Sequence, residues 1–304
     1  MAVLLSRRRL LLGASAAMLA VPAAPAGAAG TGGWRARLRA LERRHDVRIG
    51  ACAQDTARGV RVGYRAGERF PLLSTFKAFA AAAVLDRGRR HDPGLLTRRL
   101  RWAEADLVPH SPVTARHVAD GLTVAQLCDA AIAHSDNTAG NLLLGQIGGP
   151  AGLTRYLRRL GDPVSRLDRW EPDLNAWRPG DPRDTTTPAA AAGLLAATTV
   201  GGALAAEDRT RLTGWLRASV TGAARIRAGL PADWTVGDKT GTSGAYGAAN
   251  DIAVATPPGA APLVMSIYTN RPAADLPHLD PVVAATATVL AQALGRLRLA
   301  TATV

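Results

Sequence analysis

β-Rich segments lie at both ends of this chain, and a long helical stretch separates them. The runs at 47–54 and 60–64 lie near the amino end, and those at 234–240, 250–255 and 263–269 lie near the carboxyl end. Short connections between consecutive strands favour antiparallel pairing. The sequence therefore predicts that the two ends of the chain share one five-stranded antiparallel sheet.

The stretch from Pro71 to about Ala218 has a helical pattern, and no convincing strand is predicted within it. Its clearest segments are an alanine-rich run at 77–85, a helix opened by the capping box of Thr123 and Gln126, and the runs at 139–147 and 152–160. The proline-rich piece at 177–188 is predicted to be a loop.

These signals predict an α/β fold with two lobes. We expect a sheet domain made of residues 30–70 and 218–304, and an inserted all-α domain at 71–217. A helix near Trp34 and a second helix at 281–297 would flank the sheet. A cleft between two such lobes is the expected place for a ligand.

Residues 1–29 are predicted to be an export signal. Ser6-Arg7-Arg8-Arg9-Leu10-Leu11 precedes an alanine-rich apolar stretch that ends in small residues, as in a signal of the twin-arginine type. The stretch is shorter than the roughly 20 apolar residues of a membrane span, so we expect cleavage, no stable membrane anchor, and a secreted or cell-envelope location. An uncleaved amphipathic leader is the alternative.

The charge of the chain does not indicate a nucleic-acid partner. The formal net charge is +13, and removal of the predicted leader, which holds three arginines and no acid, leaves +10. The arginines are scattered singly or in pairs, whereas a nucleic-acid binder gathers basic residues in runs interleaved with aromatic ones. We therefore expect the arginines to form a solvated basic surface.

Cysteine and histidine give no sign of a metal or of a disulfide framework. Cys52 and Cys128 could form one bridge, but a chain of this size needs none, and we expect two buried free thiols. The six histidines form no H-x-H or H-E-x-x-H grouping for zinc, so no metal or other cofactor is expected.

The G-x-S-x-G motif of α/β-hydrolase esterases is also absent from the sequence.

Three short motifs carry reactive side chains, and the first is Ser74-Thr75-Phe76-Lys77. It is predicted to open a helix, which places Ser74 and Lys77 one turn apart on the same face. A serine hydroxyl becomes a good nucleophile when a neighbouring base accepts its proton, and a close ammonium and a helix amino end both stabilise the negative charge. Such a tetrad also occurs by chance in surface helices.

The other two motifs are Ser135-Asp136-Asn137, between two predicted helices, and Lys239-Thr240-Gly241-Thr242, on a predicted edge strand. Each has a structural alternative, namely helix capping for the first and a solvent-facing lysine for the second. In this order and with these separations, the three motifs resemble those of class A β-lactamases and penicillin-binding proteins. The resemblance covers essentially the whole chain after the leader and implies the two-lobed fold of those enzymes.

A fourth motif distinguishes between these two groups. Arg169-Trp170-Glu171-Pro172-Asp173-Leu174-Asn175 resembles the omega loop that class A β-lactamases have and transpeptidases lack. An acyl-serine ester persists until water attacks it, and a carboxylate base can activate that water. The resemblance gives this role to Glu171, with Asn175 holding the same water. The alternative for Glu171 is a surface carboxylate before a proline.

The resemblance implies that the protein hydrolyses β-lactams through an acyl-serine intermediate. Ser74 would be the nucleophile, and its proton would pass to Lys77 directly or to Glu171 through water. Ser135 would relay a proton to the departing lactam nitrogen. The backbone N–H groups of Ser74 and Thr242 would form the oxyanion hole.

The resemblance also implies the residues that bind the substrate. Asn137 would hydrogen-bond the side-chain amide of the substrate. The candidates around the substrate carboxylate are Lys239, Thr240, Gly241, Thr242 and Arg225. A solvated arginine on a loop is the alternative for Arg225.

Several positions depart from the pattern of the family. His110 stands where these enzymes often carry Tyr or Trp beside the cleft, and a titratable ring there could make substrate gating pH-dependent. A histidine without kinetic consequence is the alternative. Leu73 and Ser243 cannot form the disulfide that braces the site in some relatives, and Cys128 has Ala81 where its partner would stand. The substrate spectrum is therefore left open.

Two other functions compete with this interpretation. One is a DD-peptidase or another penicillin-binding protein, against which the presence of Glu171 argues. The other is a non-catalytic protein that binds β-lactams or peptidoglycan fragments on the same fold. The retention of Ser74, Lys77, Ser135 and Lys239 argues against it.

Overall fold

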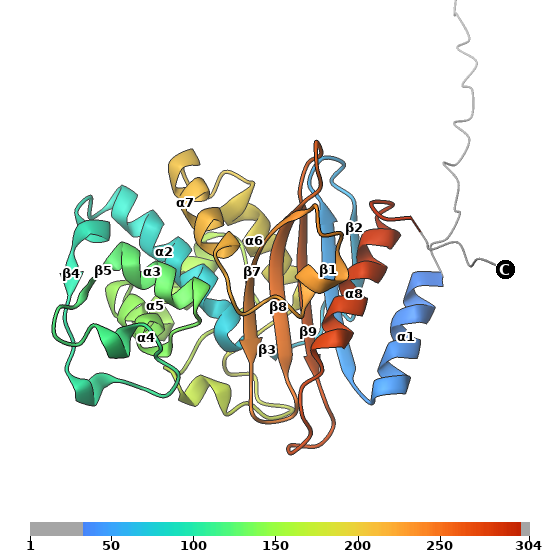
Figure 1. Cartoon of the computed structure of the whole chain (residues 1–304), viewed down its shortest axis with the longest axis horizontal. Helices are drawn as coiled ribbons and strands as arrows, with labels where there is room; N and C mark the ends of the chain where they lie inside the picture. The colour runs from blue at the N-terminus through green and yellow to red at the C-terminus, as the bar shows by residue number, and fades with distance from the viewer. Residues whose placement is uncertain (1–32, 299–304) are drawn as a thin grey trace, which may run out of the picture.

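The two ends of the chain share one sheet in the computed structural model, which describes residues 33–298 (Figure 1). The export signal predicted at 1–29 lies outside these residues. The five strands are antiparallel, in the order β2-β1-β9-β8-β7. Their bounds are Arg48–Asp55 for β1, Arg61–Tyr64 for β2, Thr235–Thr242 for β7, Ala249–Thr256 for β8 and Leu263–Asn270 for β9. The predicted sheet is therefore confirmed, and β7 is an edge strand.

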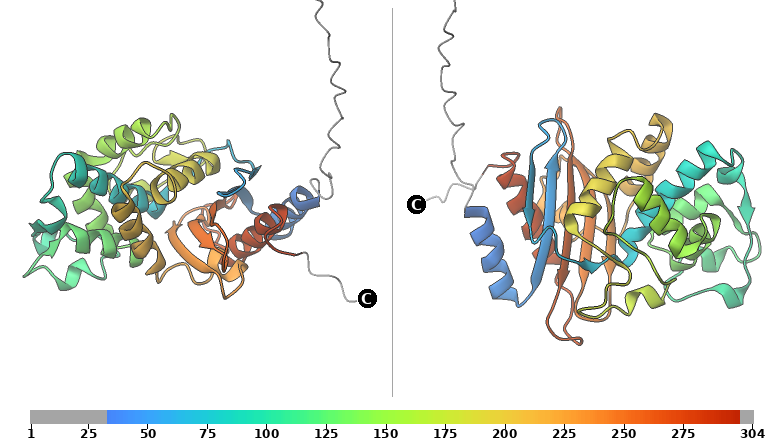
Figure 2. Two further views of the ribbon diagram at one scale, coloured as in Figure 1. Left: turned by 90° about the horizontal axis from the view of Figure 1, so that it is seen from above. Right: turned by 180° about the vertical axis from the view of Figure 1, so that it is seen from behind.

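The sheet is covered on both faces, which explains why β9 is buried along its whole length. Helices α1 (Gly33–His45) and α8 (Asp280–Ala293) pack together on one face, where Leu38, Ile267 and Leu290 belong to one apolar cluster. Helix α6 (Pro188–Thr199) packs on the other face, against β1, β8 and β9. Figure 2 shows the helical lobe beside the sheet, with α1 and α8 on the far side.

The helical lobe surrounds one almost completely buried helix. Helix α2 (Phe76–Arg90) contains the alanine-rich run, and its small side chains allow close contact with its neighbours. The neighbours are α3 (Val124–Ala133), α4 (Asn137–Gln146), α5 (Gly149–Arg159), α6 and α7 (Ala206–Arg217). The capping box of Thr123 and Gln126 is formed at the start of α3, as predicted.

The prediction that no strand interrupts this stretch was wrong. Two small two-stranded sheets occur, one pairing β3 (Phe70–Pro71) with β6 (Thr185–Thr186) and the other pairing β4 (Arg99–Leu100) with β5 (Leu122–Thr123). A strand of two residues shows no alternation in the sequence, and only tertiary contact brings its partner alongside. The 3-10 turns are η1 (Leu73–Thr75), η2 (Leu95–Thr97), η3 (Glu104–Asp106), η4 (Thr114–Arg116), η5 (Asp173–Asn175) and η6 (Ile226–Gly229).

Both cysteines are buried free thiols, as the sequence predicted. Burial raises the pKa of Cys52 to about 11, so this thiol stays protonated. Within residues 33–298, no helix combines the length and the apolar character needed to cross a membrane.

Candidate active site

A polar cavity of about 300 Å³ lies where the edge strand β7 faces the helical lobe. Its lining residues carry five hydroxyl groups, two amides and one imidazole ring, and one of the hydroxyls belongs to the predicted nucleophile. These residues are Ser74, His110, Ser135, Asn137, Asn175, Thr221, Thr240 and Thr242. Seven of the eight were predicted from the sequence, and Thr221 was not.

Ser74 and Lys77 are in direct contact. Ser74 lies in η1 and Lys77 in the first turn of α2, and Lys77 Nζ donates to Ser74 Oγ at 2.9 Å. The fully buried ammonium also donates to the backbone oxygen of Ser135, at 2.8 Å, and to Asn137 Oδ1. Burial lowers the pKa of Lys77, and the charges of Glu171 and Asp136 oppose this shift. Lys77 is therefore placed to exchange a proton with Ser74.

Glu171 belongs to the same buried cluster. Its Oε1 lies 3.1 Å from Lys77 Nζ and 3.5 Å from Ser74 Oγ, while Asn175 donates to its Oε2. The residue is only 3% exposed, so the alternative of a surface carboxylate is wrong. A carboxylate at this separation from a hydroxyl can exchange a proton with it directly or through one water.

Asn141 fixes the main chain of Glu171, and the sequence interpretation missed it. The Glu171 N–H donates to Asn141 Oδ1, and Asn141 Nδ2 donates to the Glu171 carbonyl oxygen, both at 2.9 Å. Asn141 follows Asn137 by four residues on α4, so the two share one helix face. That spacing was the available signal.

Helix capping and a place in the cavity wall fall to different residues of the Ser135-Asp136-Asn137 motif. Asp136 is the N-cap of α4 and accepts from the Ala139 N–H at 2.8 Å, so capping is its structural role. It also accepts from the backbone of Val113 and Thr114. Ser135 and Asn137, on either side of it, line the cavity instead.

Lys239 is fully buried rather than solvent-facing. Its Nζ donates to Ser135 Oγ at 3.0 Å and to the Thr240 carbonyl oxygen at 2.8 Å. Burial, and then the positive charge of Lys77, hold the pKa of Lys239 well below its ordinary value. Among the residues described, no carboxylate lies within ion-pair distance of it. This ammonium is held by neutral groups at the back of the cavity.

Gly241 allows β7 to approach η1 closely. A Cβ atom at this position would lie 3.0 Å from Leu73 Cβ and 3.2 Å from the Ser74 nitrogen, closer than ordinary van der Waals contact. The glycine therefore brings the backbone of Thr242 near that of Ser74. Gly241 contributes by allowing this close approach of the two backbones. Its carbonyl oxygen also accepts a hydrogen bond from Arg225.

Arg225 lies behind the cavity wall, only 4% exposed, so the alternative of a solvated loop arginine is wrong. Its guanidinium donates to Asp280 Oδ1, to the carbonyl oxygens of Gly241 and Asn250, and to Thr242 Oγ1 at 2.6 Å. It does not line the cavity, and it reaches the wall only through Thr242.

Thr221 reaches the cavity from the segment that also contains Arg225. Its hydroxyl lies 2.7 Å from that of Thr240. The sequence analysis selected Arg225 of this segment and did not predict a role for Thr221. His110 is exposed at the rim, where its carbonyl oxygen accepts from the Asn137 N–H at 2.9 Å.

Comparisons with known proteins show which family the chain belongs to. A model of the β-lactamase enzyme family matches residues 34–296. The carbapenem-hydrolyzing β-lactamase KPC of Klebsiella oxytoca is 50% identical over 84% of this chain and 87% of its own length, and β-lactamase AST-1 of Nocardia asteroides is 52% identical over 85% and 83%. The crystal structure of a β-lactamase from Streptosporangium roseum is 62% identical with a TM-score of 0.86, covering 87% of this chain and 99% of that one.

The fold and the site define a two-lobed α/β enzyme with a buried serine, lysine and carboxylate at its centre. An ancestral class A β-lactamase structure also matches, with 53% identity and a TM-score of 0.82 over 86% of this chain and 99% of that one. The chain belongs to the β-lactamase enzyme family and is a class A β-lactamase, an enzyme that hydrolyses β-lactams.

Proposed function

We propose that this enzyme opens β-lactams by acylating Ser74 and then hydrolyses the acyl-enzyme with a water that Glu171 activates. The supporting observation is the buried cluster in which Lys77 Nζ lies 2.9 Å from Ser74 Oγ and 3.1 Å from Glu171 Oε1. A hydroxyl that lines the cavity thus lies in one buried cluster with two groups that can accept or return a proton.

In the acylation step, Ser74 Oγ attacks the lactam carbonyl carbon and loses its proton to the pair formed by Lys77 and Glu171. The backbone N–H groups of Ser74 and Thr242 stabilise the oxyanion, which develops only in the transition state. The carbon–nitrogen bond then breaks, and Ser135 passes a proton to the departing nitrogen. The contact of Ser135 Oγ with Lys239 supports this role.

In the deacylation step, a water attacks the ester carbonyl and gives its proton to Glu171. Asn175, whose amide contacts Glu171, orients that water, and Asn141 keeps the carboxylate in place. The bond between the carbonyl carbon and Ser74 Oγ then breaks. Ser74 Oγ takes back one proton and becomes a hydroxyl again. The enzyme is then ready for another turnover.

The substrate carboxylate would be held by the hydroxyls of Thr221, Thr240 and Thr242, with Lys239 behind them. These three hydroxyls line the cavity, and Lys239 lies against Thr240. Arg225 would contribute by orienting Thr242. Asn137 would bind the side-chain amide of the substrate, and His110 would contact the substrate at the rim.

Several broader expectations belong to the same proposal. We propose a monomer that is exported by the twin-arginine signal at 1–29 and has no membrane anchor. We also propose a division into a sheet domain at 30–70 and 218–304 and an all-α domain at 71–217. The pairing of β1 with β9 supports joining the two ends of the chain in one domain.

Substitution of the carboxylate tests the mechanism. Wild type, Glu171→Gln and the exposed control Glu207→Gln would be mixed with a chromogenic cephalosporin, a penicillin and a carbapenem. We expect Glu171→Gln to give one stoichiometric burst and a covalent adduct on Ser74 in the intact mass, whereas Glu207→Gln turns over like wild type. Continuous turnover by Glu171→Gln without an adduct would contradict the proposal.

A further inference from the structure

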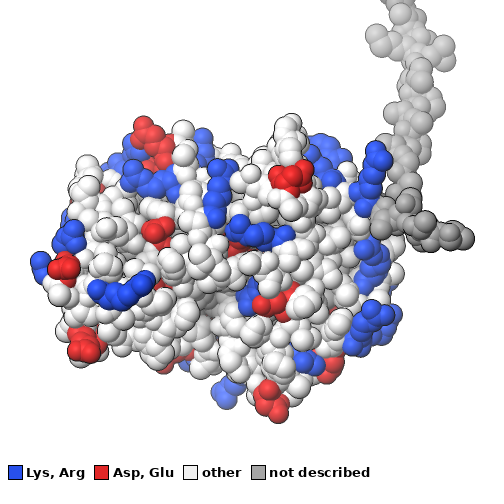
Figure 3. Space-filling model, in the orientation of Figure 1, with Lys and Arg blue, Asp and Glu red and all other residues white. Residues whose placement is uncertain are grey.

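The exposed side of α1 is unusually basic for so short a helix. Arg35, Arg37, Arg39, Arg43 and Arg44 are all exposed on it. The single acid of this helix, Glu42, pairs with Arg65 at 2.9 Å and also accepts from Tyr64. Figure 3 shows basic residues along the edge of the molecule that α1 occupies in Figure 1. This side of the enzyme therefore attracts anions.

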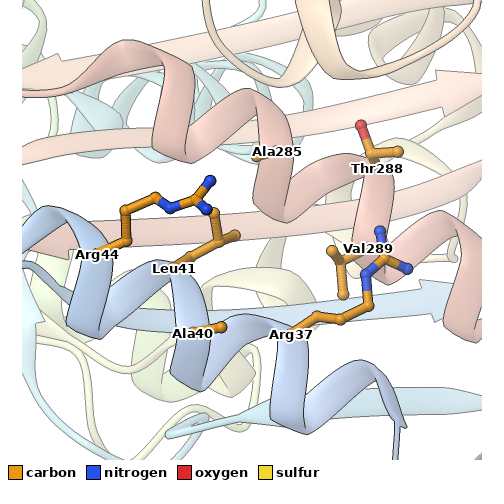
Figure 4. Close-up of a pocket in the computed structure, with 7 residues that line it drawn as sticks. All are labelled: Arg37, Ala40, Leu41, Arg44, Ala285, Thr288 and Val289. Carbon is orange, nitrogen blue, oxygen red and sulfur yellow. The ribbon is translucent and has the colours of Figure 1, made fainter.

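A groove of about 390 Å³ runs between α1 and α8, remote from the catalytic cavity (Figure 4). Its apolar lining comes from Ala40, Leu41, Ala285 and Val289. Space is left here because two of these side chains, one on each helix, are only methyl groups. The volume lies within the range of small-molecule sites, which is roughly 300–1,000 Å³.

Two of the arginines of α1 stand at this groove. Arg37 and Arg44 are seven residues apart, which corresponds to about 10 Å along the helix. The guanidinium of Arg37 is held at the edge of α8 by a hydrogen bond to Gln292 Oε1. The hydroxyl of Thr288 donates to the Gly229 carbonyl oxygen, and no carboxylate of residues 33–298 lines the groove.

We propose that this groove binds an amphiphilic anion, that is, a single carboxylate or sulfonate on a small apolar body. The apolar lining accepts the body of the ligand, and burying it removes apolar surface of both partners from water. The acidic head group lies at one end, against Arg37 or Arg44, where a guanidinium donates charge-assisted hydrogen bonds. The positive charge of the whole face favours the approach of such a ligand.

The test uses 8-anilinonaphthalene-1-sulfonate, an aromatic sulfonate, titrated by fluorescence and calorimetry against the folded enzyme. The groove variant is Arg37→Gln/Arg44→Gln, and the matched control is Arg39→Gln/Arg43→Gln, which removes the same charge from the same helix away from the groove. A third variant, Ala285→Leu, fills the groove and keeps the charge. We expect the groove variant and Ala285→Leu to weaken binding at least tenfold and the control to change it less than twofold.

Two results would overturn the proposal. Equal weakening by the two double variants would mean diffuse attraction to the basic face, as to an anionic surface. Unchanged binding by Ala285→Leu would place the probe elsewhere, and Ala40→Leu serves the same purpose if Ala285→Leu does not fold. Turnover of a chromogenic cephalosporin and the unfolding temperature confirm that each variant is native.

Discussion

Replacing Gly241 with alanine tests whether the close approach of β7 to η1 is needed for acylation. The added methyl group would lie 3.0–3.2 Å from Leu73 Cβ, the Leu72 carbonyl oxygen and the Ser74 nitrogen, so β7 must move away by a few tenths of an ångström. Loss of a whole oxyanion donor costs about 100- to 1,000-fold in rate. A lengthened hydrogen bond costs less, and we expect the acylation rate to fall about 10- to 100-fold, or about 1.4–2.7 kcal/mol.

A second glycine of the same strand supplies the control. Alanine at Gly237 meets contacts of 3.1–3.2 Å, as tight as those at Gly241, but against Leu216 and Arg217 of α7. Both variants should lose comparable stability, while only Gly241→Ala loses acylation rate. Stopped-flow acylation by a chromogenic cephalosporin and thermal unfolding measure the two effects. Acylation rates of Gly241→Ala and Gly237→Ala within twofold of each other would refute the reasoning.

Two further predictions concern the main-chain support of Glu171 and the ion pair of Asp181 with Arg183. Asn141→Ala removes both hydrogen bonds to the main chain of Glu171, so it should slow deacylation more than acylation in single-turnover experiments and lower the unfolding temperature by a few degrees. Asp181, whose pKa the hydrogen bond from Arg183 lowers to about 2, contributes stability above its ordinary pKa of 3.8 that is lost as the pH falls through 2. Because Arg183 is half exposed, Asp181→Asn should cost at most about 1 kcal/mol at pH 6. The cost, measured by urea unfolding, should shrink as the pH falls through 2, and a deficit of the same size at pH 2 would contradict this assignment.

The sheet and its covering helices could be predicted because burial leaves a periodic pattern in the sequence, but helix ends depend on local backbone geometry. The last helix was expected to run to residue 297, and it ends at Ala293. Gly295 has a positive φ of 68°, and the backbone N–H of Arg296 donates to the Ala291 carbonyl oxygen. This pattern is typical of a helix that ends at a glycine. Leu297 still packs on the sheet cluster, so its apolar character extended the predicted helix too far.

The positions of the site residues were predictable to the extent that helix or strand spacing determines them. Ser74 and Lys77 meet because one helical turn separates them. Whether Arg225 would reach the cavity was not predictable in this way. Its position depends on Asp280, which is 55 residues distant, and on two carbonyl oxygens of the sheet, and none of these contacts leaves a pattern near the arginine.

The charges around the cavity favour the binding of the substrate carboxylate that we propose. Among the residues described, Lys77 faces Glu171 and Arg225 faces Asp280, but Lys239 contacts only neutral oxygens and lies in the positive field of Lys77. Burial of this ammonium is costly, and its lowered pKa reflects that cost, although the charges of Asp238 and Asp251 partly oppose the shift. Under the proposed function, a substrate carboxylate at the threonine hydroxyls would bring a further negative charge near Lys239 and raise that pKa. The proposed binding of a substrate carboxylate in front of Lys239 is therefore favoured by the buried positive charge of this lysine.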